Sequence, residues 1–314
     1  MICIERYSSD KKQIWDTFVE KSRNGLFLFF RNYMDYHKDR FPDHSLIISE
    51  ESKVIAILPG TVIDGIYISH PGLTFGGFII DNSMTTSNMI LVFQRVIHYL
   101  KDQKINKIIY KCIPYIYSDI PCEEDRYALF LQNSQLIRRD VTTSINLSQR
   151  LAFQKIRRRC ITKAKKTGIT VKESEDYATY WRILTECLIK YHETLPVHSV
   201  REIQNLKEHF PNNIRLFCSF LNDKMLAGVI IFENKNIAHA QYIASSDDGR
   251  EMGALDVLFA ELIEKHFVNK KYFDFGISNE NEGKYLNEGL IFYKEGFGAR
   301  AIVHDFYEVD LIDR

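Results

Sequence analysis

The sequence has no excess of charge of either sign, since 41 Lys and Arg residues offset 41 Asp and Glu residues over 314 positions. This balance excludes a uniform field that would draw nucleic acid or an anionic membrane to the whole surface, so any basic site must be local. Long apolar runs are also missing. The most apolar stretch, Gly25 to Phe30, is far shorter than the roughly 20 residues that span a bilayer. The charged start, MICIERYSSD, lacks the apolar core of a signal peptide. We therefore expect a cytoplasmic protein without membrane insertion.

Cysteine is scarce and scattered along the chain. The six cysteines form no Cys-x-x-Cys pair and have no histidine at ligand spacing, which argues against a zinc site or a disulfide framework. We expect reduced, mostly buried thiols and no metal. The hydrophobic content is 45%, which is enough to fill the cores of about two domains of ~150 residues each.

The sequence does contain one succession of elements twice. In the first half, the patterns predict three strands within residues 45–70, a glycine-rich segment at 71–78, and a helix over 85–103. A strand at 107–114, a helix from about 123 to 135 and a strand at 136–147 complete this half. From residue 213 the order recurs as a hairpin at 213–233, a strand at 236–245, a glycine turn at 246–253 and a helix at 253–267. A strand at 271–278, a short helix at 286–294 and a last strand at 300–309 follow.

This repetition predicts an internal duplication with a boundary near residue 148. We predict an α/β protein of two tandem domains, 1–147 and 148–314, each with a mixed α+β arrangement in which helices flank a mixed sheet.

Residues 148–167, between the two repeats, predict an amphipathic basic helix. Ser148 can cap its start, and Gly168 is a stop signal after two lysines. One apolar face is expected, formed by Phe153, Ile156, Cys160 and Ala164. Two interpretations remain open. The basic face is either simply solvated or an anion site for phosphates or RNA, in which case Arg158 is a candidate substrate contact.

The glycine turn of the second half is a candidate phosphate site. The first turn of a helix presents unpaired N–H groups and the positive end of its dipole, which suit a pyrophosphate. The candidate residues are Gly249, Arg250, Gly253 and Ala254. Glycines at such a turn are also common for geometric reasons alone, so this alternative stays open.

The order of elements, with Arg250 and Gly253 in this turn, resembles the GNAT acyltransferases, whose Gln/Arg-x-x-Gly-x-Gly/Ala pattern binds the pyrophosphate of coenzyme A. Leu255 stands at the last small position of that pattern. The duplication, the segment RRRCITKAKKTG, and FDFG followed by YKEGFGA resemble the tandem-GNAT branch more closely. That branch includes the Fem-type peptidoglycan aminoacyltransferases and their acyl-CoA-using relatives in surface-polysaccharide synthesis. The resemblance implies two GNAT-like domains with the acyl-donor site in the second.

In the Fem-type enzymes an aromatic–lysine pair just before a Phe-Gly lies at the reaction centre. The resemblance therefore implies that Tyr293 and Lys294 are catalytic and that the lysine stabilises the oxyanion formed in acyl transfer. One such fixed donor typically lowers the barrier by about 3 to 4 kcal/mol. The alternative is a solvated lysine at a helix end.

Acyl transfer to an amine also needs a base. His239 and Gln241 share one face of the strand at 236–245, and Tyr242 takes the other, directly before the glycine turn. His239 is the candidate base, while Gln241 and Tyr242 are candidate substrate contacts. His198, in a loop between two helical segments, is a second candidate, and Asp274 could orient the amine or anchor a turn. Either histidine could equally be a packed structural residue.

The glycine-rich segment of the first half lacks the Arg-x-x-Gly pattern. We therefore expect residues 1–147 to be a degenerate GNAT-like domain that has lost coenzyme binding and helps to hold the acceptor. Gly72, Gly76 and Gly77 would let a backbone approach a sugar or diphosphate closely. A glycine-rich bulge that only shapes a sheet edge is the alternative.

Together these features predict an N-acyltransferase that moves an acetyl group from acetyl-CoA to the amine of a nucleotide-linked amino sugar or similar cell-surface precursor. Two alternatives remain. One is an aminoacyl-tRNA-dependent transferase acting on a peptidoglycan precursor, and the other is a catalytically silent protein that keeps the fold. We expect no DNA partner, and tRNA only in the first alternative.

Overall fold

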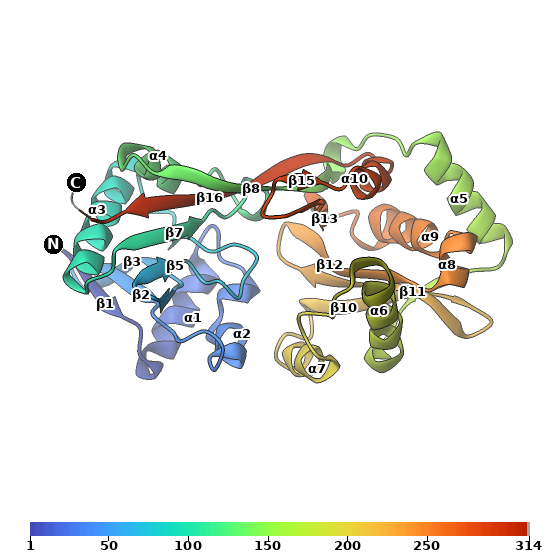
Figure 1. The fold of residues 1–314 in the computed structure, drawn as a ribbon, viewed down its shortest axis with the longest axis horizontal. Helices are drawn as coiled ribbons and strands as arrows, with labels where there is room; N and C mark the ends of the chain where they lie inside the picture. The colour runs from blue at the N-terminus through green and yellow to red at the C-terminus, as the bar shows by residue number, and fades with distance from the viewer. Residues whose placement is uncertain (313–314) are drawn as a thin grey trace. The chain divides into compact units, whose positions relative to one another are not determined.

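The structure is a computed structural model that describes residues 1–312 (Figure 1). The chain divides into two compact units. Unit 1 consists of Met1–Asp140, Asn281–Tyr285 and the described residues from Val303 onward, and unit 2 of Val141–Glu280 and Leu286–Ile302. Because strands β8 (Gln135–Asn146) and β16 (Arg300–Asp310) each run from one unit into the other, the units do not follow a single cut in the sequence. The predicted division at residue 148 stays a prediction.

Unit 1 contains two sheets. One has the strand order β1-β2-β3-β6, and in the other β4, β5, β7 and the end of β16 are neighbours. The parallel pair β5–β7 lies within otherwise antiparallel neighbours, as expected of a mixed sheet. The elements are β1 (Ile2–Arg6), α1 (Lys12–Lys21), α2 (Arg31–Met34), β2 (Leu46–Glu50), β3 (Lys53–Leu58), β4 (Thr61–Ile63), β5 (Ile66–Ile68), β6 (Ile79–Ile80), α3 (Thr86–Asp102), β7 (Lys107–Lys111) and α4 (Glu124–Leu131).

Unit 2 is built on a sheet with the order β8-β13-β12-β11-β10-β9, in which only β12 and β13 are parallel among the pairs described. Val229 and Ile231 of β11 pack in one core cluster with α9, whereas Gly228 lies against Tyr180 of α6. Alternate residues of a strand point to opposite faces, so α9 and α6 cover opposite faces of this sheet (Figure 1). The elements are α5 (Lys155–Lys166), β9 (Thr170–Glu173), α6 (Tyr177–His192), α7 (Val200–His209), β10 (Ile214–Leu221), β11 (Lys224–Glu233), β12 (Ile237–Ser245), α8 (Asp247–Met252), α9 (Ala254–Glu261), β13 (Tyr272–Ile277), β14 (Asn279–Glu280), β15 (Tyr285–Leu286) and α10 (Glu288–Glu295).

The predicted mixed sheets flanked by helices are confirmed, and most predicted elements lie where the patterns placed them. The helix expected to run to residue 135 is wrong at its end, because α4 stops at Leu131 and Asn133 turns the chain with a φ of 53°. Within residues 1–312, every helix is too short or too polar to cross a membrane.

The basic helix also differs from the prediction at its start and on its buried face. α5 begins at Lys155, because the Ser148 hydroxyl bonds to Asn146 and Gln154 takes the N-cap position. Its buried residues are Arg157, Ile161 and Ala164, and Ile156 is exposed. The predicted apolar face is therefore wrong at Ile156, whereas Ala164 is buried and Phe153 packs against a core cluster as predicted. A buried arginine, neutralised by a neighbouring carboxylate, takes a position that pattern reading assigned to solvent.

The glycine turn predicted at residues 246–253 is wrong as well, since most of it is the short helix α8. Ser246 caps this helix by accepting a hydrogen bond from the Gly249 N–H. Gly253 forms the joint to α9 in the left-handed conformation, with a φ of 75°. A Cβ there would also lie 3.1 Å from the Cys160 carbonyl oxygen of α5, so glycine is required by the joint itself.

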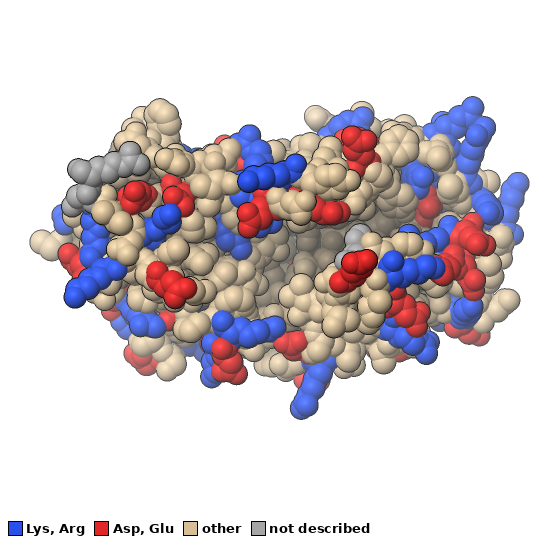
Figure 2. All heavy atoms as spheres, viewed as in Figure 1, with Lys and Arg blue, Asp and Glu red and all other residues tan. Residues whose placement is uncertain are grey.

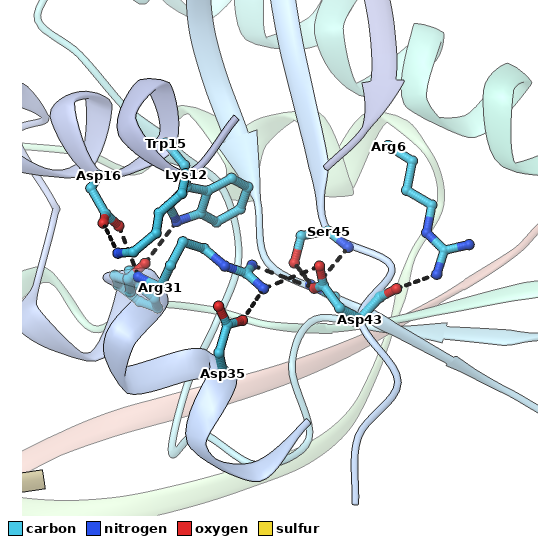
Figure 3. A network of polar contacts seen from close by, with 10 residues as sticks. Arg6, Lys12, Trp15, Asp16, Arg31, Asp35, Asp43 and Ser45 are labelled. Carbon is cyan, nitrogen blue, oxygen red and sulfur yellow. Dashed lines mark hydrogen bonds and ion pairs between the residues drawn. The ribbon is translucent and has the colours of Figure 1, made fainter. Parts of the chain in front are cut away.

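A buried arginine organises the start of unit 1 (Figure 3). Arg31 is 2% exposed, pairs with Asp35 and lies 3.2 Å from the Asp43 carboxylate. Its guanidinium also lies 3.8 Å from the centroid of the Tyr7 ring. Because the two carboxylates are themselves partly exposed, the network joins a buried cation to solvated anions.

Replacing this cation should destabilise unit 1. We expect Arg31→Met to lower the free energy of unfolding by about 2 kcal/mol, less than for a pair buried on both sides, because water can rehydrate the carboxylates. Lys12→Met is the matched control, since Lys12 is a 44% exposed side chain that pairs with Asp16 at 2.6 Å. Urea denaturation of the two variants measures the difference, and an equal loss in both would contradict this account.

Candidate functional site

The sheet of unit 2 opens where β12 and β13 part. The two strands are paired in parallel from Ile237 opposite Tyr272 to His239 opposite Asp274. Just beyond, Ile230 and Ile231 of β11 face Tyr242 and Ala240, so Gln241 is an extra residue that bulges out of the ladder. The pairing of β13 with β8 also shifts after Asp274. The pairings of β12 with β13, of β11 with β12 and of β13 with β8 therefore place an irregular backbone next to the ionisable side chains of His239 and Asp274.

His239 and Asp274 form a dyad at this opening. The Nδ1 atom of His239 lies 2.6 Å from one carboxylate oxygen of Asp274, and the Thr142 hydroxyl of β8 donates to the other oxygen at 2.6 Å. Asp274 is fully buried, and the His239 side chain is 12% exposed. A carboxylate on Nδ1 fixes the orientation and tautomer of an imidazole and leaves Nε2 as the nitrogen that can exchange a proton.

Lys294 of α10 lies near the same opening but is not a solvated lysine. It is 2% exposed and donates to the carbonyl oxygens of Gly276 and Ile277 at 2.8 and 2.7 Å. A third bond, of 2.9 Å, goes to the Ser278 hydroxyl. Burial lowers the pKa of Lys294 to about 8, and the charge of Asp274 opposes that shift. Its ammonium holds the backbone at the end of β13.

Tyr293, the neighbour of Lys294 in the sequence, faces a different set of residues. The Arg157 guanidinium lies 4.5 Å from the centroid of its ring and forms a 2.7 Å ion pair with Asp256 of α9. Burial raises the pKa of Asp256, and Arg157 counteracts it. Because both partners are buried, Arg157 links α5 to α9 and α10. Tyr293 thus packs in a structural cluster.

A second polar pair lies on the α6 side of β12. The Tyr242 hydroxyl is 2.5 Å from Nδ1 of His198, and the Trp181 ring packs edge-on against Tyr242 at 5.3 Å. His198 is 7% exposed and directly precedes Ser199, which caps α7. The structure therefore brings together His239 with Asp274, and His198 with Tyr242.

The residues predicted to bind coenzyme phosphates are engaged with their own chain. Gly249 is buried inside α8, and Arg250 stacks over Tyr191 at 4.0 Å and donates to the Cys187 sulfur. The first turns of the two helices carry acidic residues, which are Asp247 and Asp248 in α8 and Asp256 in α9. A phosphate at either helix start would meet these carboxylates. Each of these carboxylates is paired with a cation, which is Lys190, Lys224 or Arg157, and the coenzyme role of the residues around Gly249–Ala254 stays a prediction.

The outer face of α5 is strongly basic (Figure 2). The helix contains no acidic residue. Its exposed cations are Arg158 and five others, namely Lys155, Arg159, Lys163, Lys165 and Lys166. Lys163 donates to the Glu251 carbonyl at 2.8 Å. This face could accept phosphates, and the role predicted for Arg158 stays a prediction.

In unit 1, the glycine-rich segment approaches its own chain closely. A Cβ at Gly72 would clash with the His37 ring, one at Gly76 with the Ser69 carbonyl, and one at Gly77 with the Tyr110 hydroxyl. Glycine at these positions is therefore required by internal packing, and an acceptor contact stays a prediction. Lys111, 7% exposed, ties the segment down by donating to the carbonyls of His70 and Leu73.

Lys111 should make stability depend on pH. Burial lowers its pKa from 10.5 to about 7, helped by the charge of Arg138. Between pH 7 and 10.5 the unfolded chain holds more protons than the folded protein, so the free energy of unfolding rises with pH. Between pH 7 and 9.5, we expect the free energy of unfolding of the wild type to rise by about 1 to 2 kcal/mol relative to that of Lys111→Met. Urea titrations at both values measure this gain, and parallel curves would show that Lys111 titrates normally.

Comparison with known proteins agrees with this geometry. Residues 152–294, which contain the β12–β13 opening, match the model of the acetyltransferase (GNAT) domain. This part of the chain is therefore a GNAT-type acetyltransferase domain. A comparison with curated protein sequences finds no match.

Solved structures share the fold of this chain over almost its whole length. The crystal structure of FemX has a TM-score of 0.67 at 12% identity, covering 96% of both chains. L-PGS from Bacillus licheniformis has a TM-score of 0.64 at 12% identity, covering 99% of this chain and 94% of that one. A tandem GNAT protein from the clavulanic acid biosynthesis pathway has a TM-score of 0.55 at 8% identity, covering both chains fully. The predicted GNAT fold and family resemblance are confirmed.

Sequence reasoning missed several residues that the structure brings to the site or to the elements that support it. Thr142, Ser278, Arg157 and Asp256 are examples. Their partners lie between 16 and 132 positions away in the sequence, so no local pattern could have paired them. Within the part of the chain that the structure describes, no group of three or more His, Cys, Asp or Glu side chains could hold a metal ion.

Proposed function

We propose that this enzyme transfers an acyl group to the amine of an amino sugar or another cell-envelope precursor, with His239 as the general base. The observation that carries the proposal is the His239–Asp274 dyad at the point where β12 and β13 part. The fold similarity to FemX supports a cell-envelope acceptor only as an analogy.

The reaction would proceed by direct attack. The amine nitrogen bonds to the acyl carbon, the bond from that carbon to the leaving group breaks, and Nε2 of His239 takes the amine proton. Asp274 stabilises the resulting imidazolium, and Thr142 keeps the carboxylate in place. His239 then returns the proton to the leaving group.

Acetyl-CoA is the proposed donor, in line with the GNAT domain. The proposed steps concern the acyl group alone and do not depend on where the pyrophosphate binds. Aminoacyl-tRNA is the second candidate, and the specific observation that favours it is the six-cation outer face of α5.

A thermal-shift panel followed by mass spectrometry tests the donor. Acetyl-CoA, a longer acyl-CoA, coenzyme A, nucleotide-linked amino sugars and an aminoacylated tRNA are compared. A ligand at 100 times its dissociation constant should add about 2.7 kcal/mol of stability. We expect acetyl-CoA to stabilise the protein and to acetylate an amino sugar. Stabilisation and product formation by aminoacyl-tRNA alone would replace the donor with the second candidate.

The outer face of α5 gives a separate prediction. Because Arg158 and Arg159 are exposed, the double variant Arg158→Glu/Arg159→Glu should change stability by no more than about 0.5 kcal/mol per site. If this face holds donor phosphates, the Michaelis constant for the donor should rise about tenfold and its dependence on salt should weaken. Unchanged donor constants at every ionic strength would show that the face is only solvated.

A further inference from the structure

We infer that Lys294 is a positioning residue: it fixes the backbone of Gly276–Ser278 and, through this segment, holds His239 and Asp274 in place. The predicted role as the oxyanion-binding group is replaced by this one. The effect on turnover rests on the proposed function, whereas the effect on the segment does not.

The hydrogen bonds of the ammonium carry the first step of the argument. An ammonium group has three protons, and Lys294 has three acceptors at 2.7 to 2.9 Å on Gly276, Ile277 and Ser278. The side chain is 2% exposed. An oxyanion could reach the ammonium only by displacing one of these acceptors, and that acceptor would lose its hydrogen bond to Lys294.

The backbone conformation of Gly276–Ser278 explains why this segment needs the hydrogen bonds from Lys294. The pairing of β13 with β8 is interrupted between Asp274 and Ile277, and Gly276 adopts a φ of 77°. The Gly276 and Ile277 carbonyls lie where the ladder shifts, in a partly buried place, and Lys294 donates a hydrogen bond to each of them. The far end of the segment is anchored through Ser278, which donates its N–H to Val141 and accepts from Asn287.

The segment in turn borders the dyad. A Cβ at Gly276 would lie 3.5 Å from Cε1 of His239 and 3.5 Å from the Ala240 carbonyl oxygen, so the Gly276 backbone packs against the imidazole. Asp274 is only two residues earlier on the same strand. A displacement of the segment therefore moves both the ring and the carboxylate that orients it.

Hydrogen exchange and NMR test the inference without any substrate. Lys294→Met deletes the ammonium. Ser278→Ala removes one acceptor but keeps the hydrogen bonds from Lys294 to the Gly276 and Ile277 carbonyls. Lys265→Met is the control, because Lys265 is a 67% exposed lysine in an i,i+4 pair. We expect amides of residues 274–279 to exchange about tenfold faster in Lys294→Met, less so in Ser278→Ala, and unchanged in the control.

The imidazole gives a second readout. The Nδ1 proton that His239 shares with Asp274 should give a downfield proton signal, assigned by its loss in His239→Gln. We expect it to broaden or move in Lys294→Met. Wild-type exchange and an unchanged His239 signal in Lys294→Met would overturn the inference. If turnover falls in Lys294→Met while exchange and the His239 signal stay as in the wild type, Lys294 acts directly on the transition state. Failure of every donor in the ligand panel would remove the proposed function and leave this structural result standing.

Discussion

His239→Gln should lower kcat about 1000-fold while the Michaelis constants of both substrates stay close to those of the wild type. The substitution keeps a polar side chain of similar length but removes the group that takes the amine proton. General acid–base catalysis by a positioned side chain typically contributes 10² to 10⁴. Because the loss concerns an interaction made in the transition state, it should appear in kcat and kcat/KM equally. The acetyl-transfer assay by mass spectrometry gives both constants.

A matched control separates this effect from a general loss of structure. His209 is exposed at the end of α7, where its Nδ1 lies 2.9 Å from the Asn205 carbonyl. We expect His209→Gln to have wild-type constants. A His239→Gln protein that retains more than a tenth of wild-type kcat would remove His239 as the base and leave His198, with its partner Tyr242, as the next residue to test.

Arg157→Met should be the most destabilising single substitution considered for unit 2. Its guanidinium and the Asp256 carboxylate are 11% and 9% exposed and lie 2.7 Å apart. Removing one partner of a buried pair typically costs about 3 to 5 kcal/mol, because the other charge stays buried. The stem of Arg157 also contacts Gly296, and its guanidinium packs on Tyr293, so α5 would loosen from α10.

The adjacent arginine provides the control. Arg158 is exposed on the same helix, so Arg158→Met should change stability by no more than about 0.5 kcal/mol. Urea denaturation at pH 7 compares the two variants. The deficit of Arg157→Met should shrink as the pH falls, because burial raises the pKa of Asp256 and a protonated Asp256 no longer carries a buried charge. Equal stability of the two variants at pH 7 would contradict the assignment of Arg157 as a buried link.

The parts of this fold that could be predicted are those with local patterns. The hairpin β2–β3 follows from two apolar runs around a Glu-Ser-Lys turn, in which Glu51 and Ser52 adopt φ values of 48° and 68°. Helix α3 follows from its apolar spacing. The short elements of residues 1–44 were not predicted, since α2 has only four residues and its buried Arg31 reads as a surface residue.

The site divides in the same way. His239 and Asp274 could be chosen because each lies on a strongly patterned strand, but their contact depends on the parallel register of β12 and β13. Arg157 and Lys294 were misjudged for one physical reason. A buried cation with a full set of partners cannot be told from a solvated one until those partners, on other elements, are known.

Chemical rescue of His239→Ala by imidazole tests the central claim most directly. Alanine leaves space beside Asp274, and free imidazole can then supply the missing base. The account predicts that acyl transfer by the variant rises with imidazole concentration and follows the basic form of imidazole as pH is varied, while the wild type does not respond. A His239→Ala enzyme that folds, binds donor and acceptor, and shows the same residual rate at every imidazole concentration would contradict the assignment of His239 as the base.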